Sequence, residues 1–88
     1  MLSIDLRGVI AAGLGRTSIE LPVPTGGISV SRLLEAAVAR EPRLERYLAL
    51  RDSGSLRTIV NGASVTVGED PTVTEGDSVL LLAAVPGG

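Results

Sequence analysis

Alternating apolar and polar residues open the chain. Leu2, Ile4 and Leu6 alternate with polar residues, and Thr17 to Leu21 repeats the pattern. A period of two predicts strands with one buried face. Between these segments, Gly8 to Gly15 is apolar but interrupted by glycines, so we predict a turn or short loop there. The two strands are expected to pair as a hairpin with a long turn.

A helical period follows. Ser29 is a candidate N-cap, and apolar residues then recur at intervals of three and four, at Val30, Leu33, Leu34, Ala37 and Val38. This spacing predicts an amphipathic helix. Pro42 ends it, because the residue before a proline disfavours helical backbone. A short second helix is a candidate over Arg43 to Leu50, with three side chains turned inward: Leu44, Tyr47 and Leu48.

The second half of the chain predicts strands again. The strongest turn signal is Asn61-Gly62, because a type I′ hairpin turn needs positive φ at both central positions. It separates predicted strands at Leu56–Val60 and Ser64–Val67. A short extended piece at Thr72–Thr74 lies between two turns, and Ser78–Val85 is the last and most hydrophobic strand.

The order of these segments indicates the fold class. Strand and helix patterns are mixed without regular β-α-β alternation, which favours an α+β fold. We predict a sheet of four to five strands with one main helix packed on one face. The 88 residues suit one domain. The expected division is a domain over residues 1–85 and a flexible tail over residues 86–88.

Both faces of the last strand are apolar. A strand covered on both sides has this pattern, yet one main helix covers only one side of a sheet. We therefore expect Val79 and Leu81 to face the helix. The opposite set should meet a partner protein, since exposed apolar patches mark interaction sites; it consists of Leu80, Leu82 and Ala84. The alternative is that Arg43–Leu50 or a loop covers this second set.

Composition excludes several functions. The chain has no cysteine, and its His count is 0, so a thiolate nucleophile, a disulfide and the usual metal sites are excluded. All eight basic residues are arginines, and they are scattered, which argues against nucleic-acid binding. The longest apolar run is far shorter than a membrane helix needs, and no secretory signal is visible. We therefore expect a cytoplasmic protein with no bound metal or cofactor.

The C-terminus is the best candidate for chemistry. The last strand runs directly into Pro86, Gly87 and Gly88. Residues without a side chain can thread a narrow channel in which a Cβ atom would clash. The carboxylate of Gly88 is then open to activation. The acidic residues lie mostly in turns and on predicted solvent faces, where they cap backbone donors, so an active site within the domain is not expected.

These segments resemble a known family. The stretch from Gly76-Asp77 through the apolar strand to Gly87-Gly88 is similar to the end of the ubiquitin-like sulfur carriers, which include the molybdopterin-synthase small subunit and the thiamin and cysteine sulfur carriers. Ser29 to Pro42 resembles their helix, and Ile59-Val60-Asn61-Gly62 resembles their hairpin. The resemblance covers nearly the whole chain and implies a β-grasp fold.

The resemblance also implies a mechanism and partners. A ubiquitin-activating-type enzyme uses ATP to adenylate the carboxylate of Gly88, while Pro86 and Gly87 thread its active site. A sulfur donor, persulfide or sulfide, then leaves a thiocarboxylate. An acceptor enzyme takes the sulfur for molybdopterin, the thiazole of thiamin, cysteine or another sulfur-containing metabolite. The resemblance thus implies a co-substrate and sulfur donor rather than an enzyme, or else the small subunit of a sulfurtransferase such as molybdopterin synthase.

Two other functions fit the same sequence. A protein modifier would be joined through Gly88 to lysines of other proteins. A plain β-grasp interaction module would bind through its sheet and leave the tail unused. The chain has no lysine, so it cannot form lysine-linked polymers of itself. An independent enzyme is the least compatible with the residue inventory.

Overall fold

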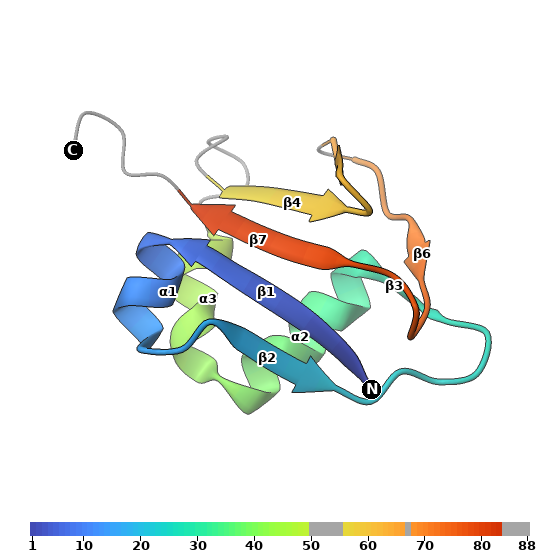
Figure 1. Cartoon of the computed structure of the whole chain (residues 1–88), viewed down its shortest axis with the longest axis horizontal. Helices are drawn as coiled ribbons and strands as arrows, with labels where there is room; N and C mark the ends of the chain where they lie inside the picture. Colours follow the sequence, from blue (N-terminus) through green and yellow to red (C-terminus); the bar gives the residue numbers. More distant parts are fainter. Residues whose placement is uncertain (50–55, 67, 84–88) are drawn as a thin grey trace.

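A five-stranded sheet backed by helices is the centre of the structure, a computed structural model that describes residues 1–49, 56–66 and 68–83 (Figure 1). The strands are β1 (Leu2–Gly8), β2 (Ser18–Leu21), β3 (Ile28–Ser29), β4 (Leu56–Val60), β5 (Ala63–Ser64), β6 (Thr72–Val73) and β7 (Val79–Ala83). The helices are α1 (Val9–Leu14), α2 (Val30–Arg40), the 3₁₀ turn η1 (Pro42–Leu44) and α3 (Glu45–Leu48). The prediction of an α+β, β-grasp fold is confirmed.

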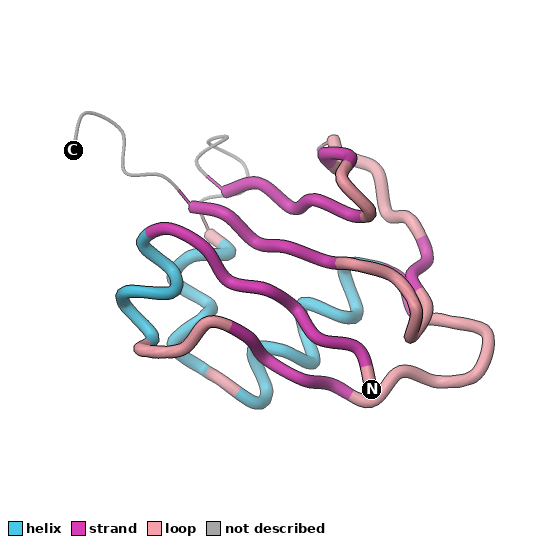
Figure 2. Tube along the Cα trace, viewed as in Figure 1, coloured by secondary structure: helices cyan, strands magenta, loops and turns pink. Residues whose placement is uncertain are grey.

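The sheet is mixed, with strand order β2-β1-β7-β4-β5. β1 and β7 pair in parallel, whereas β1 with β2, β4 with β7, and β4 with β5 pair antiparallel. The helices lie together on one face of this sheet, and the other face carries no helix in the described part of the chain (Figures 1 and 2). In this strand order β7, the strand nearest the C-terminus, lies in the middle of the sheet.

The core lies between the sheet and the helices. Alternate residues of β1 are buried, at Leu2, Ile4 and Leu6, and every second residue of β7 is buried as well. The facing helix α2 buries four side chains: Val30, Leu33, Leu34 and Ala37. Aliphatic side chains fill this core, since the chain has no Phe or Trp and only one Tyr.

Two predicted elements agree closely with the structure. The oxygen of Ser29 accepts a hydrogen bond from the backbone N–H of Arg32, as expected of an N-cap. Asn61 and Gly62 have φ of 50° and 85°, which is the positive φ at both turn positions that a type I′ hairpin requires.

The predicted loop at Gly8 to Gly15 is wrong, because Val9–Leu14 forms the helix α1. Its apolar residues Ile10 and Leu14 are four positions apart and both are buried, which is a helical spacing. Gly8 and Gly15 flank the helix, so only Gly13 interrupts it. The glycines at positions 8 and 15 therefore mark the ends of a short helix rather than a loop.

Other predicted bounds change. The strand predicted at Ser64–Val67 is β5 over Ala63–Ser64, and Val67 lies outside the described residues. The backbone N–H of Thr66 donates to the carboxylate of Glu69 at 2.8 Å instead of to a neighbouring strand. The predicted second helix divides into η1 and α3. The extended piece near Thr72 pairs with Ile28–Ser29 as a separate small sheet, which the sequence did not predict.

Candidate functional site

The end of β7 is the root of the C-terminal tail. Ala83, the last described residue before the tail, is paired on one side with Gly8 of β1 and on the other with Leu56 of β4. The predicted tail residues Pro86, Gly87 and Gly88, and Ala84 of the predicted partner surface, lie outside the described residues. The last described residue before the tail therefore lies in the central strand of the sheet.

Gly8 makes this arrangement possible. At this residue β1 turns away into α1, with φ of 67° and ψ of −139°, a backbone conformation that is almost confined to glycine. A Cβ atom at Gly8 would lie 2.6 Å from the carbonyl oxygen of Ala83. The absence of a side chain thus lets the two backbones approach closely at the point where the tail begins.

Burial along β7 separates its two faces. Val79, Leu81 and Ala83 are no more than 1% exposed and face the helices, which agrees with the predicted parity. Leu80 and Leu82 are half-buried and belong to the opposite face. The alternative, that the segment after Pro42 covers them, does not hold for its described part, since η1 and α3 lie with the other helices (Figure 1).

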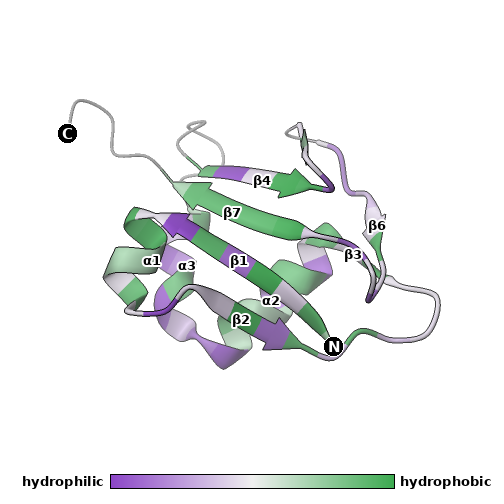
Figure 3. Cartoon of the chain, in the orientation of Figure 1, coloured by the Kyte–Doolittle hydropathy of each residue, from purple (hydrophilic) through white to green (hydrophobic). Residues whose placement is uncertain are grey.

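Strand register defines the neighbours of these two leucines. Leu80 is opposite Ile59 of β4 and Asp5 of β1, and Leu82 is opposite Arg57 of β4 and Arg7 of β1. Residues directly opposite in a sheet project from the same side. We call this surface the open face and define it by six residues: Asp5, Arg7, Arg57, Ile59, Leu80 and Leu82. Figure 3 shows hydrophobic β7 flanked by hydrophilic segments of β1 and β4.

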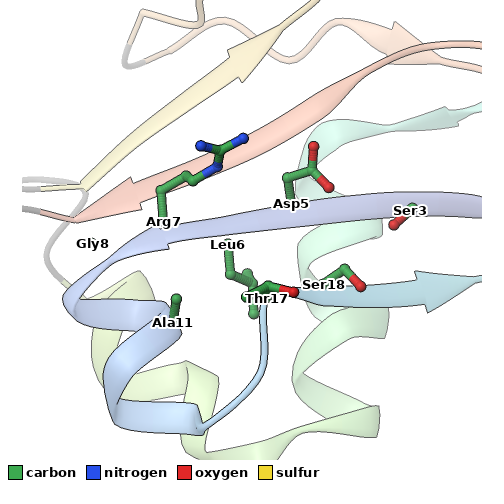
Figure 4. A pocket seen from close by; sticks show the side chains of 8 residues that line it. All are labelled: Ser3, Asp5, Leu6, Arg7, Gly8, Ala11, Thr17 and Ser18. Carbon is green, nitrogen blue, oxygen red and sulfur yellow. The ribbon is translucent and has the colours of Figure 1, made fainter.

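A hollow adjoins the open face where β1 meets α1. Figure 4 shows Asp5 and Arg7 rising from the same side of β1, with Arg7 extending over β7. The residues that line the hollow come from β1, α1 and the start of β2: Ser3, Asp5, Leu6, Arg7, Gly8, Ala11, Thr17 and Ser18. Most of these residues are polar or small, Leu6 being the exception, and none is a cysteine or a histidine.

Several of the described carboxylates take part in structural hydrogen bonds. The pKa of Glu41 is lowered mainly by a hydrogen bond from Arg43, whose guanidinium lies 2.8 Å from the Glu41 carboxylate. Backbone N–H groups lower the pKa of Glu69 and Asp77, the former from Thr66 and the latter from Thr74. General acid–base catalysis at neutral pH needs a carboxyl group with a raised pKa, and these shifts are all in the other direction.

The described residues also contain no cluster of three or more Asp or Glu side chains that could hold a metal ion. Within the same residues, no helix is long and apolar enough to cross a membrane. The open face and the adjoining tail remain the candidate site.

Comparison with known sequences decides the family. The sequence model of the ThiS family matches residues 14–88, from the end of α1 to the last glycine. The chain belongs to the ThiS family. A search of curated proteins finds no match. The ThiS-family match confirms the resemblance to ubiquitin-like sulfur carriers.

Solved structures with the same fold are small archaeal modifier proteins. The crystal structure of SAMP1 from Haloferax volcanii is 26% identical, with a TM-score of 0.74, and the match covers 99% of this chain and 98% of that one. A crystal structure of H. volcanii small archaeal modifier protein 1 is 25% identical over 96% and 97% of the two chains, with a TM-score of 0.69. SAMP1 from Methanosarcina acetivorans, in solution, is 20% identical over 99% and 95%, with a TM-score of 0.72, and shows the fold alone.

Together these findings make the chain a ubiquitin-like carrier or modifier protein rather than an enzyme. The sequence predicted the two leucines of the open face but missed its other four members: Asp5, Arg7, Arg57 and Ile59. Their alternation with buried neighbours was visible in the sequence. Which strands lie next to β7 was not, so the surface itself could not be predicted.

Proposed function

We propose that this ThiS-family protein carries sulfur as a thiocarboxylate on Gly88. The observation that carries the proposal is the family match, which extends through the final Gly87-Gly88. The root of the tail at the centre of the sheet supports it, because a partner docked on the open face would receive the tail directly.

The proposed chemistry needs no side chain of this protein. An oxygen of the Gly88 carboxylate attacks the α-phosphorus of ATP, and pyrophosphate leaves. Sulfide, or the terminal sulfur of a persulfide, then attacks the acyl carbon of the adenylate, and AMP leaves with the electrons of the broken C–O bond. With a persulfide, a thiol must reduce the resulting acyl disulfide to release the thiocarboxylate. The activating enzyme supplies ATP binding and any acid or base.

The tail is long enough to extend into a channel of the activating enzyme. Five residues, 84–88, follow Ala83, and an extended chain spans at most about 3.6 Å per residue, or roughly 18 Å in all. In the proposed complex, Pro86 and Gly87 occupy a narrow channel. Leu80, Leu82 and Ala84 contact the enzyme outside it, together with Ile59. The domain stays at the channel mouth.

The test is the intact mass of the protein after incubation with ATP, sulfide and a ubiquitin-activating-type adenylating enzyme from the same cell. We expect a gain equal to the difference between one sulfur and one oxygen atom. Deletion of Gly88 should abolish it. A matched control is the full chain with the Gly88 carboxylate converted to an amide, which keeps every residue but removes the attacking oxygen.

Unchanged mass with an enzyme that is active in ATP–pyrophosphate exchange would contradict the proposal. The acceptor in the same proposal is a biosynthetic enzyme of the molybdopterin, cysteine, thiamin or another sulfur pathway. Loss of one of these products on deletion of Gly88 from the cell would identify it.

A second candidate function is protein modification, because the structural neighbours at 26% and 25% identity are modifier proteins by name. In this function Gly88 forms an amide with lysines of target proteins. High-molecular-weight conjugates that vanish on deletion of Gly88 would support it. Since the chain has no lysine, a second copy cannot be joined to a lysine of the first. Each modified lysine of a target protein should therefore carry one copy of this chain. If neither thiocarboxylate nor conjugates form, an interaction module with an unused tail is the remaining function.

A further inference from the structure

Two arginines flank the root of the tail on the open face. Arg7 and Arg57 are both cross-strand neighbours of Leu82, one from each side. Two strand spacings of about 4.8 Å separate their backbones. Both side chains are exposed. A pair of guanidinium groups therefore brackets the last leucine before the tail begins.

Two other arginines, Arg16 and Arg43, have partners within the fold. Arg43 pairs with Glu41, and Arg16 donates to the carbonyl oxygen of Ser18. Within the described ranges, neither Arg7 nor Arg57 makes a hydrogen bond or an ion pair. Their charges are therefore not neutralised by the described part of the fold.

Charge on the open face is also polarised along β7. The row nearest the tail holds Arg7 and Arg57, and the next row holds Asp5 beside Leu80. One row farther from the tail, Glu20 is paired with Ser3. The surface is thus basic at the tail and acidic away from it, although the chain as a whole has a formal net charge of −2.

We propose that Arg7 and Arg57 recognise carboxylates at the mouth of the channel into which the tail threads on the activating enzyme. This inference rests on the proposed function and names the chemistry of the partner. Leu80, Leu82 and Ile59 supply the apolar contact, while the arginine pair orients the domain so that its tail end approaches first. Complementary charges of this kind set association rate and orientation more than final affinity.

The arginines contact the enzyme rather than the ATP phosphates. A fully extended tail would place the Gly88 carboxylate roughly 18 Å from Ala83, whereas both arginines lie one residue before Ala83 in the register of the sheet. The groups that they meet must therefore belong to the protein surface around the channel.

Charge reversal tests the proposal. The KM of the full chain for the adenylating enzyme is measured from pyrophosphate release with ATP. Arg7→Glu and Arg57→Glu should each raise KM about fivefold or more with little change in kcat, because each replaces an attraction by a repulsion of similar size. The KM of the unaltered protein should rise with ionic strength, since salt screens exposed charges. In the double variant, Arg7→Glu with Arg57→Glu, this dependence should reverse, because salt then screens a repulsion.

Arg32→Glu is the matched control. It makes the same change of charge at an exposed residue of α2, on the helix side of the sheet, and should leave KM within about twofold of the original, as a charge far from the contact is screened. Double replacement by lysine, Arg7→Lys with Arg57→Lys, keeps both charges and should retain most of the activity. Thermal unfolding verifies that every variant is folded.

Three outcomes overturn the inference. If Arg7→Glu and Arg57→Glu have the KM of Arg32→Glu, the pair makes no contact, and the sulfur-carrier function stands if the protein is still converted to the thiocarboxylate. If the lysine variant is as poor as the glutamate variants, the effect is not one of charge. If the unaltered protein is not adenylated at all, the proposed function fails together with this inference.

Discussion

Gly8 lets the backbone of β1 lie close to Ala83, the last described residue before the tail, because it has no side chain. Its φ of 67° and ψ of −139° turn β1 into α1, and its Cα atom packs against the backbone of Ala83. Gly15, at the other end of α1, has the same φ of 67°, but a Cβ atom there would meet nothing within 4 Å. An alanine at Gly15 would therefore meet only backbone strain, whereas an alanine at Gly8 would meet both backbone strain and a steric clash with Ala83.

We expect Gly8→Ala to destabilise the fold much more than Gly15→Ala. The left-handed conformation at Gly15 should cost alanine about 1 kcal/mol. At Gly8 the less accessible conformation and the collision with Ala83 should together cost on the order of 3 kcal/mol. Urea unfolding of both variants measures the difference. Equal losses of unfolding free energy in the two variants would show that the close contact between Gly8 and Ala83 does not contribute to stability.

Helix α2 depends on a distant loop as well as on its own N-cap. The backbone N–H of Ser31 donates to a carboxylate oxygen of Asp70 at 2.8 Å, and its hydroxyl donates to the other at 2.7 Å. The backbone N–H of Val30 donates to the carbonyl of Pro71 at 3.0 Å. These bonds satisfy donors that the first turn of a helix leaves unpaired. They join α2 to the segment that leads into β6.

Asp70→Ala should therefore destabilise the protein by about 1–2 kcal/mol, the usual effect of losing an N-terminal cap. Asp70→Asn should have a smaller effect, because its amide oxygen can still accept one of the two hydrogen bonds. Chemical denaturation of the three proteins gives the order. An asparagine variant as unstable as the alanine variant would mean that the negative charge, and not hydrogen bonding, stabilises the helix.

Elements with a long, regular period were predictable, and those defined by contacts were not. The period of α2 and the Asn61-Gly62 turn were both found from the sequence, since each depends on residues that are near one another along the chain. Helix α1 has only six residues, so its period was too short to outweigh three glycines. Pairing of β3 with β6 joins residues more than forty positions apart, and no local pattern marks it.

Side-chain hydrogen bonds join the loops across the fold. Asn61 donates to the carboxylate of Asp77 at 3.0 Å and accepts the backbone N–H of Ser78 at 2.9 Å. The hairpin after β4 is thus tied to the turn before β7. On the helix side, Arg43 bonds both Glu41 and the carbonyl oxygen of Leu14, which joins η1 to the end of α1. Several of these links need an ionised carboxylate.

Acid should therefore weaken the fold. The pKa values of Glu41, Glu69 and Asp77 are lowered in the folded protein, so below their ordinary values the unfolded chain binds more protons than the folded one. The stability that these groups contribute is present above about pH 5. It is lost as the pH falls through 4.5 for glutamate and 3.8 for Asp77 towards the lower values of the folded state.

Urea unfolding at a series of pH values between about 2 and 7, across the range in which carboxylates titrate, measures this loss. Asp77→Asn should make the decline with acid shallower, because that position no longer titrates. Glu35→Gln is the control, as it removes a carboxylate from the exposed surface of α2. The hypothesis is wrong if Asp77→Asn leaves the slope of stability against pH unchanged.

Local patterns in the sequence decided which residues form α2 and β7, which side chains of each strand share a face, and that a Gly-Gly tail follows the last strand. These are properties of neighbours along the chain, set by the periods of helix and strand. Only the tertiary structure decided that β7 lies between β1 and β4 and that Arg7 and Arg57 lie on either side of Leu82. Such contacts join residues as far apart as the two ends of the chain, and their energies depend on the whole packed core rather than on any short segment.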